Sequence, residues 1–96
     1  MTGVVLSPRA QADLDAIWNY TIEHWGADQA ERYVREIWQA IAVVAADPRR
    51  AQSCDDIRAG YRKYAVGSHV IFFRMPDNTI DVVRILHARM DFVRHI

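Results

Sequence analysis

The stretch DQAERYVREIWQAIAVVAADP, residues 28–48, decides the fold of this 96-residue chain. Its apolar side chains recur every three or four residues, which predicts a long amphipathic helix with one buried face. Asp28 and Glu31 form a variant of the capping box, and Asp47 ends the helix because the residue before a proline avoids helical geometry. The predicted stripe consists of Ala30, Tyr33, Val34, Ile37, Trp38, Ile41, Val44 and Ala45.

A second helix is predicted immediately upstream. Ser7 suits the N-cap and Pro8 suits the first helical position, where no amide hydrogen is needed. Gly26 should end this helix as a left-handed cap, and so short a link folds the two helices into an antiparallel hairpin. Residues 4–6 before it predict a short strand. The helical spacing is carried by Leu14, Ile17, Trp18, Thr21 and Trp25.

Downstream of the hairpin, the polar residues 49–60 predict a loop. Three strand-like segments follow, at residues 61–66, 69–75 and 80–87. Turn sequences separate them, so neighbouring strands should be antiparallel. The predicted order is β-α-α-β-β-β. The fold class is α+β, with an antiparallel helical hairpin packed on one face of a small, mainly antiparallel sheet.

The phase of the helices also predicts the core between hairpin and sheet. Trp38 is among its largest members, and replacing it with alanine should cost about 3–5 kcal/mol if it is buried there. The predicted core consists of Leu14, Ile17, Trp18, Tyr33, Val34, Ile37, Trp38, Ile41 and Phe73.

Length and composition indicate one ordinary domain that spans residues 1–96. Apolar residues make up 51% of the chain and charged residues 25%, as in soluble globular proteins. No apolar run approaches the roughly 20 residues that cross a bilayer, and the first residues lack a secretion signal. Cys54 is the only cysteine, so we expect a reducing, cytoplasmic location. The four histidines show no ligand spacing, so neither a metal nor a cofactor is expected.

The formal charge is zero, with 12 basic and 12 acidic side chains, but the charges are unevenly distributed. Residues 1–48 carry three basic and seven acidic side chains, a net charge of 3 − 7 = −4. Residues 49–96 carry nine basic and five acidic side chains, a net charge of 9 − 5 = +4. The second half either faces an anionic partner or is an ordinary solvated surface.

Three blocks of sequence together resemble toxins of the ParE type, within the ParE/RelE superfamily. They are LSPRAQADLDAI at residues 6–17, YRKYAVG at residues 61–67 and IDVVRILHARMD at residues 80–91. The resemblance implies one toxin domain of a type II toxin–antitoxin module, which inhibits DNA gyrase by binding it and is silenced by a ParD-like antitoxin. It implies no catalytic centre, no membrane association and no sequence-specific binding of nucleic acid.

RelE-type relatives share the fold but cleave messenger RNA on the ribosome, so the alternative function is a ribosome-dependent endoribonuclease. Cleavage needs acid–base groups and cations, and a ribosome binder should be strongly basic. This chain is neutral, and Lys63 is its only lysine, which disfavours the nuclease. A third possibility is a degenerate toxin that is retained as a co-repressor. The nuclease candidates are His87, Arg62, Arg84 and Arg89.

Two of these candidates also have structural explanations. A histidine at a strand end, such as His87, most often hydrogen-bonds a neighbour and orders a turn. Arg84 lies within an apolar strand and therefore needs a carboxylate partner. Asp81 is too near Arg84 in sequence and has the wrong strand parity to be that partner.

Partner surfaces are predicted from residues that fall off the buried stripe. The resemblance implies an amphipathic antitoxin segment in a groove, with aromatic anchors and arginines that bind its carboxylates. The predicted antitoxin-binding residues are Tyr20, Trp25, Arg62, Arg74, Arg84 and Arg89. The resemblance also ties the C-terminal region to toxicity, and the predicted target-binding residues are Arg89, Met90, Asp91 and Phe92.

Overall fold

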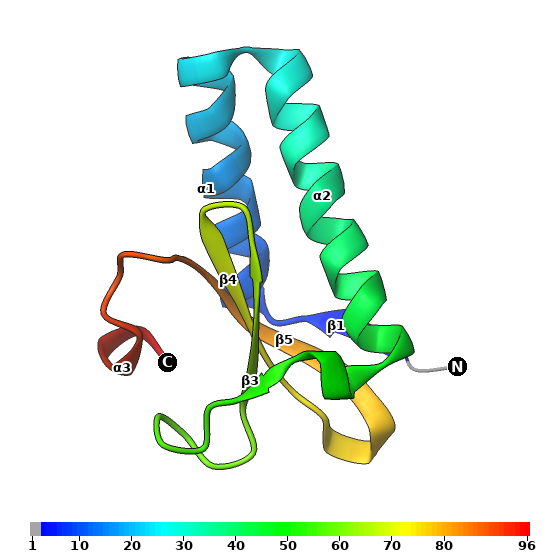
Figure 1. The fold of residues 1–96 in the computed structure, drawn as a ribbon. Coiled ribbons are helices and arrows are strands. Elements are labelled where there is room, and N and C mark those ends of the chain that lie inside the picture. The colour runs from blue at the N-terminus through cyan, green and yellow to red at the C-terminus, as the bar shows by residue number, and fades with distance from the viewer. Residues whose placement is uncertain (1–2) are drawn as a thin grey trace.

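A computed structural model describes residues 3–96 of the chain, and its two layers confirm the α+β class (Figure 1). Two antiparallel helices cover one face of a five-stranded sheet with strand order β1-β5-β4-β3-β2. β1 runs parallel to β5, and the other neighbouring strands are antiparallel. The elements are β1 (Gly3–Leu6), α1 (Pro8–Trp25), α2 (Ala27–Ala46), η1 (Pro48–Arg50), β2 (Gln52–Ser53), β3 (Arg62–Val66), β4 (His69–Arg74), η2 (Pro76–Asn78), β5 (Thr79–His87) and α3 (Phe92–His95).

α1 begins as the sequence predicts. The Ser7 hydroxyl oxygen accepts a hydrogen bond from the amide of Ala10 at 3.0 Å, and Pro8 occupies the first helical position. The same Ser7 hydroxyl donates to the carbonyl of Val83, and the Ser7 amide donates to the carbonyl of Val82. Ser7 therefore fixes the start of the helix against β5.

The turn between the helices differs from the prediction. Gly26 has φ 91° and ψ 170°, which lies outside the left-handed helical region. It serves as the N-cap of α2, which begins at Ala27 without a side-chain cap, so the capping box predicted at Asp28 and Glu31 is wrong. The reason is that one glycine reverses the chain, which places Asp28 already in the first turn of the helix.

The segment predicted as a loop contains a fifth strand. Gln52 and Ser53 form β2, which pairs with Lys63 and Arg62 of β3. The order is therefore β-α-α-β-β-β-β. Residues 49–60 do not alternate between apolar and polar, and a two-residue edge strand depends on backbone pairing, so sequence patterning could not reveal it.

Strand alternation divides the apolar residues of β4 and β5 between two cores, and a β-bulge in β5 shifts which of its residues face the helices. Phe72 pairs with Arg84 and Phe73 pairs with Val82, so Val83 is an extra residue in β5. Phe73 and Val82 pack under the helices, whereas Phe72 packs on the opposite face of the sheet. There the Phe92 ring of α3, an element that the sequence did not predict, lies 4.8 Å from the Phe72 ring, centre to centre.

The core under the helices is partly the predicted one. The prediction is wrong for Trp18 and Trp38, which are 36% and 42% exposed, and Tyr33 and Val34 are only half-buried. The buried positions of α2 are Ala30, Ile37, Ala40, Ile41 and Val44, and Trp38 lies at the margin of that stripe. The confirmed core residues are Leu14, Ile17, Ile37, Ile41 and Phe73.

The helical hairpin is longer than β4, the central strand of the sheet that it covers. α1 has 18 residues and α2 has 20, or roughly 27 and 30 Å at 1.5 Å per residue. β4 has six residues, or roughly 20 Å. The closed end of the hairpin therefore projects beyond the sheet (Figure 1). Among residues 3–96, no helix combines the length and the apolar composition that crossing a bilayer requires.

Candidate functional site

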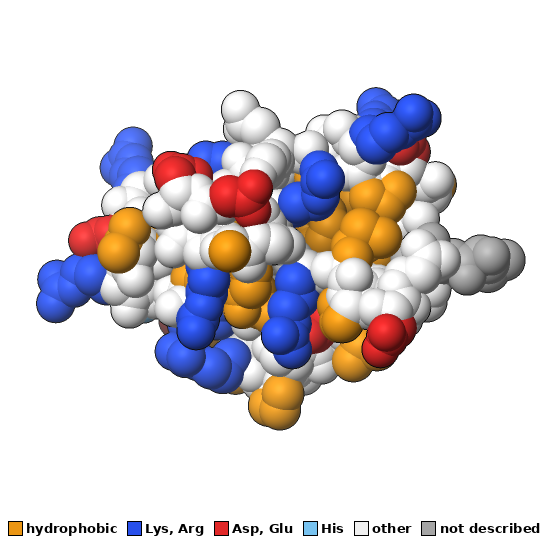
Figure 2. Space-filling model, turned by 90° about the horizontal axis from the view of Figure 1, so that it is seen from below, with side chains coloured by type: hydrophobic (Ala, Val, Ile, Leu, Met, Phe, Trp, Pro, Cys, Tyr) orange, Lys and Arg blue, Asp and Glu red, His pale blue; other side chains and the backbone are white. Residues whose placement is uncertain are grey.

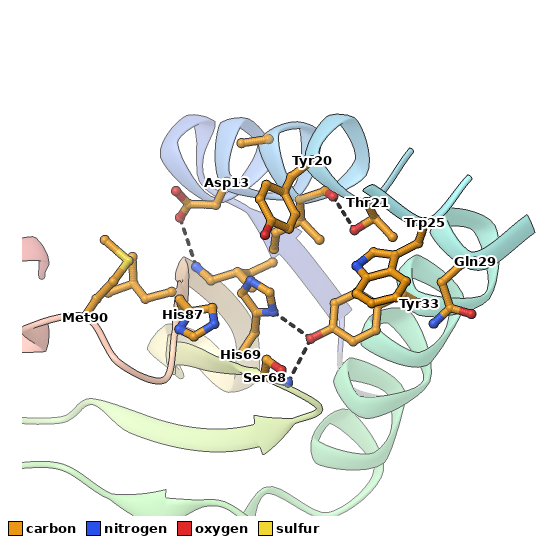
Figure 3. Close-up of a pocket in the computed structure, with 14 residues that line it drawn as sticks. Asp13, Tyr20, Thr21, Trp25, Gln29, Tyr33, Ser68, His69, His87 and Met90 are labelled. Atoms are coloured by element: carbon orange, nitrogen blue, oxygen red, sulfur yellow. Dashed lines mark hydrogen bonds between the residues drawn. The ribbon is translucent and has the colours of Figure 1, made fainter. Parts of the chain in front are cut away.

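A groove of about 670 Å³ opens where the helices project beyond the sheet. It lies between α1, the start of α2, and the adjoining ends of β4 and β5. Figure 3 shows it running from Met90 at one end to Trp25 at the other, with His87, His69 and Tyr33 between them. Tyr20 and Trp25 on its rim are 60% and 71% exposed.

The floor of the groove contains a short hydrogen bond between two elements. The Tyr33 hydroxyl of α2 lies 2.6 Å from Nδ1 of His69 in β4, and the Ser68 amide donates to the same hydroxyl at 3.0 Å (Figure 3). Gly67 makes this approach possible, because a Cβ there would lie 2.6 Å from Cε1 of Tyr33. Burial raises the pKa of Tyr33, against the opposing effect of the Ser68 amide.

Two histidines meet on this floor. The rings of His69 and His87 are 5.3 Å apart, centre to centre, and nearly perpendicular. Burial lowers the pKa of His69, the proximity of His87 lowers it further, and Asp13 partly opposes both effects. Nδ1 of His87 accepts a hydrogen bond from the amide of Arg89 at 3.1 Å, which confirms that His87 bonds a neighbour and orders a turn.

An ion pair closes the wall of the groove on the side of α1. Asp13 accepts hydrogen bonds from Nε and Nη2 of Arg84 at 2.8 and 2.9 Å, and from the amide of Ile85 at 2.9 Å. Arg84 also donates to the carbonyl of His95, and its bonds to Asp13 raise its pKa. The predicted structural ion pair of Arg84 is confirmed, while Asp81 instead pairs with Arg74 at 2.9 Å.

The structure brings part of the predicted antitoxin-binding set together. Tyr20 and Trp25 both line the groove. Arg84 is already bonded to Asp13, and Arg74 lies at the far end of β4 from His69. Arg62 and Arg89 also lie outside the groove lining.

The predicted target-binding segment is divided between the two faces of the molecule. Met90 lies on the rim of the groove. Asp91 is the N-cap of α3, and Phe92 packs on Phe72 on the opposite face of the sheet. The backbone amide of Arg89 donates a hydrogen bond to His87, which stabilises the turn between Met90 and the end of β5.

The nuclease candidates do not converge. His87 points into the groove, whereas the guanidinium of Arg84 is bonded to Asp13 and the tail. Arg62 shares a sheet face with His87, since it pairs with Phe73. However, it lies four residues along β3 from Val66, the partner of His69, or roughly 13 Å.

Basic side chains gather on the underside of the molecule. Figure 2 shows Lys and Arg side chains standing beside hydrophobic patches on this face. Arg58 lies 5.7 Å from the centre of the Tyr61 ring, a cation–π geometry. Cys54 is buried nearby among apolar residues, and burial raises the pKa of its thiol, which makes it a poor nucleophile. Between residues 3 and 96, potential metal-binding side chains do not gather in groups of three or more.

Sequence reasoning missed three residues of the groove. The apolar stripe of α2 predicts Tyr33 as a core residue, but its hydroxyl group lies in the groove. The sequence signal for His69 is its position directly after the Gly67-Ser68 turn. The sequence could not predict that Asp13 pairs with Arg84, because 71 residues separate them.

Comparisons with known proteins identify a family and several relatives of this chain. Residues 4–92 match the family described as ParE toxin of type II toxin-antitoxin system, parDE. The chain is 54% identical over 93 residues to Toxin ParE1 of Mycobacterium tuberculosis (strain ATCC 25618 / H37Rv), covering 96% of this chain and 95% of that protein. It is 43% identical over 91 residues to Toxin ParE1 of Caulobacter vibrioides, covering 95% and 94%.

Solved structures share the fold at low sequence identity. The chromosomal ParDE TA system from P. aeruginosa contains a chain that superposes with a TM-score of 0.79 at 21% identity, covering 91% of this chain and 96% of that one. The toxin–antitoxin complex RelBE2 from Mycobacterium tuberculosis gives a TM-score of 0.66 at 18% identity, covering 90% and 96%. At such identities the similarity shows the fold alone.

Proposed function

This chain belongs to the ParE toxin family of type II toxin–antitoxin systems, and we propose that it inhibits DNA gyrase by binding it and is silenced by a ParD-like antitoxin. It would do so as one domain of residues 1–96 in the cytoplasm. The observation that carries the proposal is the open groove with its exposed aromatic rim. Exposed aromatic side chains that gather around one groove, here Tyr20 and Trp25, are typical of an interaction surface.

The groove suits an amphipathic segment of the antitoxin. Tyr20, Trp25 and Met90 offer apolar contacts along its length, and aromatic anchors of this kind supply much of the energy of many interfaces. A helix or extended segment that laid its apolar face on these residues would cover them. The two solved structures described above come from toxin–antitoxin systems, which supports an antitoxin as the occupant.

Charge supports capture of the antitoxin more than its final affinity. The net charge of +4 in residues 49–96 would steer an acidic, flexible chain toward the toxin. Arg62, Arg74 and Arg89 lie outside the groove lining, so in this proposal they bind carboxylates around the seated segment. Arg84 is left out because its guanidinium binds Asp13 and its side chain is only 12% exposed, whereas the side chain of Arg74 is 52% exposed beside Asp81.

Met90 links the antitoxin to the target. It lies on the rim of the groove and within the predicted target-binding segment of residues 89–92. An antitoxin seated in the groove would cover Met90 and prevent that segment from reaching gyrase. Silencing would then result from competition for one surface.

The first experiment tests the target. Purified protein is added to a gyrase supercoiling assay, and separately to a translation reaction whose messenger is analysed by primer extension. We expect inhibition of supercoiling and an intact messenger. Codon-specific cuts in the messenger with unaffected supercoiling would replace this proposal with the endoribonuclease. Absence of both effects would favour a degenerate toxin.

The second experiment tests the groove with two exposed tryptophans. Trp25 lines the groove, whereas Trp38 lies on α2 outside its lining. Trp25→Ala should weaken binding of the full-length antitoxin encoded beside the toxin by about 30-fold, as expected for an interface hot spot. Trp38→Ala should change it by less than about threefold. Equal effects of the two substitutions would place the antitoxin elsewhere.

A further inference from the structure

We propose that the antitoxin seats an uncharged, apolar side chain against His69 and His87, so that antitoxin binding and protonation of this pair exclude each other. The inference rests on the proposed function of the groove. It adds the chemistry of the occupant at one point and a proton-dependent regulation. The geometry that carries it is a pair of histidines at the bottom of an apolar groove, each tied to a neighbour through Nδ1.

The ring of His87 is bonded to its own turn through Nδ1. Its Nδ1 accepts the hydrogen bond from the Arg89 amide, and a protonated imidazole has no free lone pair at that atom. The neutral ring therefore carries its hydrogen on Nε2. Protonation would remove one of the bonds that hold the turn leading to Met90, a residue of the groove rim.

His69 is coupled to a single hydroxyl hydrogen. Tyr33 has two possible acceptors, Nδ1 of His69 at 2.6 Å and the carbonyl of Val66 at 3.4 Å, and it donates to the nearer one when His69 is neutral and carries no hydrogen on Nδ1. Protonation of His69 reverses that bond. The hydroxyl hydrogen must then turn to the longer and weaker contact with Val66.

The charged groups around the two histidines do little to stabilise the protonated form of either imidazole. On α1, Asp13 favours protonation of His69, but both its oxygens already accept bonds from Arg84 and its neighbour Ile85. On α2 the facing titratable group is Tyr33, and on β4 and β5 the histidines face each other. The turn after β5 contributes Arg89 and Asp91, both exposed to solvent.

The rim determines the kind of side chain that fits. Tyr20, Trp25 and Met90 surround the pair with apolar surface, so an occupant that covers them also removes water from the two imidazoles. Removal of water disfavours the charged form of histidine. An apolar occupant therefore favours neutral histidines, and acid should release it. A carboxylate occupant would favour protonated histidines, and acid would tighten it.

The experiment measures the dissociation constant of the full-length antitoxin encoded beside the toxin, by isothermal titration calorimetry at pH 7.5 and pH 5.5. One histidine with an ordinary pKa near 6.5 that must be neutral would weaken binding about tenfold over this range. Because the pKa of His69 is lowered, its own share is smaller. We expect a weakening of about three- to tenfold.

Variants separate the pair from other effects of pH. In the double variant His69→Asn and His87→Asn, an amide oxygen takes the place of each Nδ1 acceptor without titrating. This double variant should bind the antitoxin with the same affinity at both pH values, apart from any contribution of the antitoxin itself. The control His95→Asn, on α3 and outside the groove lining, should retain the full difference.

The outcomes distinguish this inference from the proposed function. Binding that is lost with Trp25→Ala but is independent of pH, or tightens in acid, overturns the inference and leaves the function standing. Binding that is unchanged by Trp25→Ala overturns both the inference and the proposed function of the groove. A second readout needs no antitoxin: the imidazole nitrogen resonances of the free protein should show His87 protonated on Nε2 alone at pH 7.5, and protonation on Nδ1 would contradict the inference.

Discussion

Replacement of Asp13 by alanine tests the contact that joins the first helix to the last strand. The carboxylate accepts three hydrogen bonds, two from Arg84 and one from the Ile85 amide. Arg84 and Asp13 have side chains that are only 12% and 15% exposed. Asp13→Ala therefore leaves a guanidinium and an amide without their acceptor in a largely water-free position.

The expected magnitude follows from this burial. Removal of one partner from a fully buried ion pair costs about 3–5 kcal/mol, and a somewhat lower figure suits the small residual exposure of these side chains. We expect Asp13→Ala to lower the free energy of unfolding by about 2–4 kcal/mol. For a domain of this size that corresponds to a fall in Tm of about 8–30 °C.

The assay is urea unfolding followed by tryptophan fluorescence, with a double-mutant cycle that adds Arg84→Ala. The coupling energy between the two substitutions should be about 1–3 kcal/mol. Asp81→Ala is the matched control, because its partner Arg74 is 52% exposed and such surface pairs contribute about 0.2–1 kcal/mol. A loss below 1 kcal/mol for Asp13→Ala, or a coupling energy near zero, would refute the reasoning.

Three further predictions concern stability. Trp38→Ala should lower the free energy of unfolding by about 1 kcal/mol, and Phe73→Ala should lower it by about 3–5 kcal/mol, because only Phe73 is fully buried. Equal losses for the two variants in urea unfolding would contradict this prediction. Gly67→Ala should cost more than about 1 kcal/mol in the same assay, since φ is +55° and the new Cβ would meet the Tyr33 ring at 2.6 Å; an unchanged midpoint would be the contrary result. The pKa of His69 is lowered by folding, so its contribution to stability is complete above the unfolded value of 6.5 and is lost as the pH falls below it. Thermal melts at pH 7.5 and 5.5 should show a larger decrease for wild type than for His69→Asn.

The amino-acid sequence alone determined the order of the helices and of most strands along the chain. It also determined which side of each helix is apolar. The apolar period of residues 28–48 and the punctuation at Ser7-Pro8, Gly26 and Asp47-Pro48 are local signals, and a helical hairpin with a following antiparallel sheet is what they predict. Local signals also placed His87 in a turn and required an ion partner for Arg84. Backbone-only pairing, as in β2, leaves no such signal.

Only the tertiary structure decided which side chains share the groove. Tyr33, His69 and His87 come from three elements, and their meeting depends on where the hairpin overhangs the sheet. Packing also decides that Trp38 is 42% exposed, because Ile37, Ala40 and Ile41 face the core and the tryptophan lies at the margin of their stripe. The spacing of apolar residues in the sequence predicts which face of a helix is apolar. How deeply each of these residues is buried depends on how the helix packs against its neighbours.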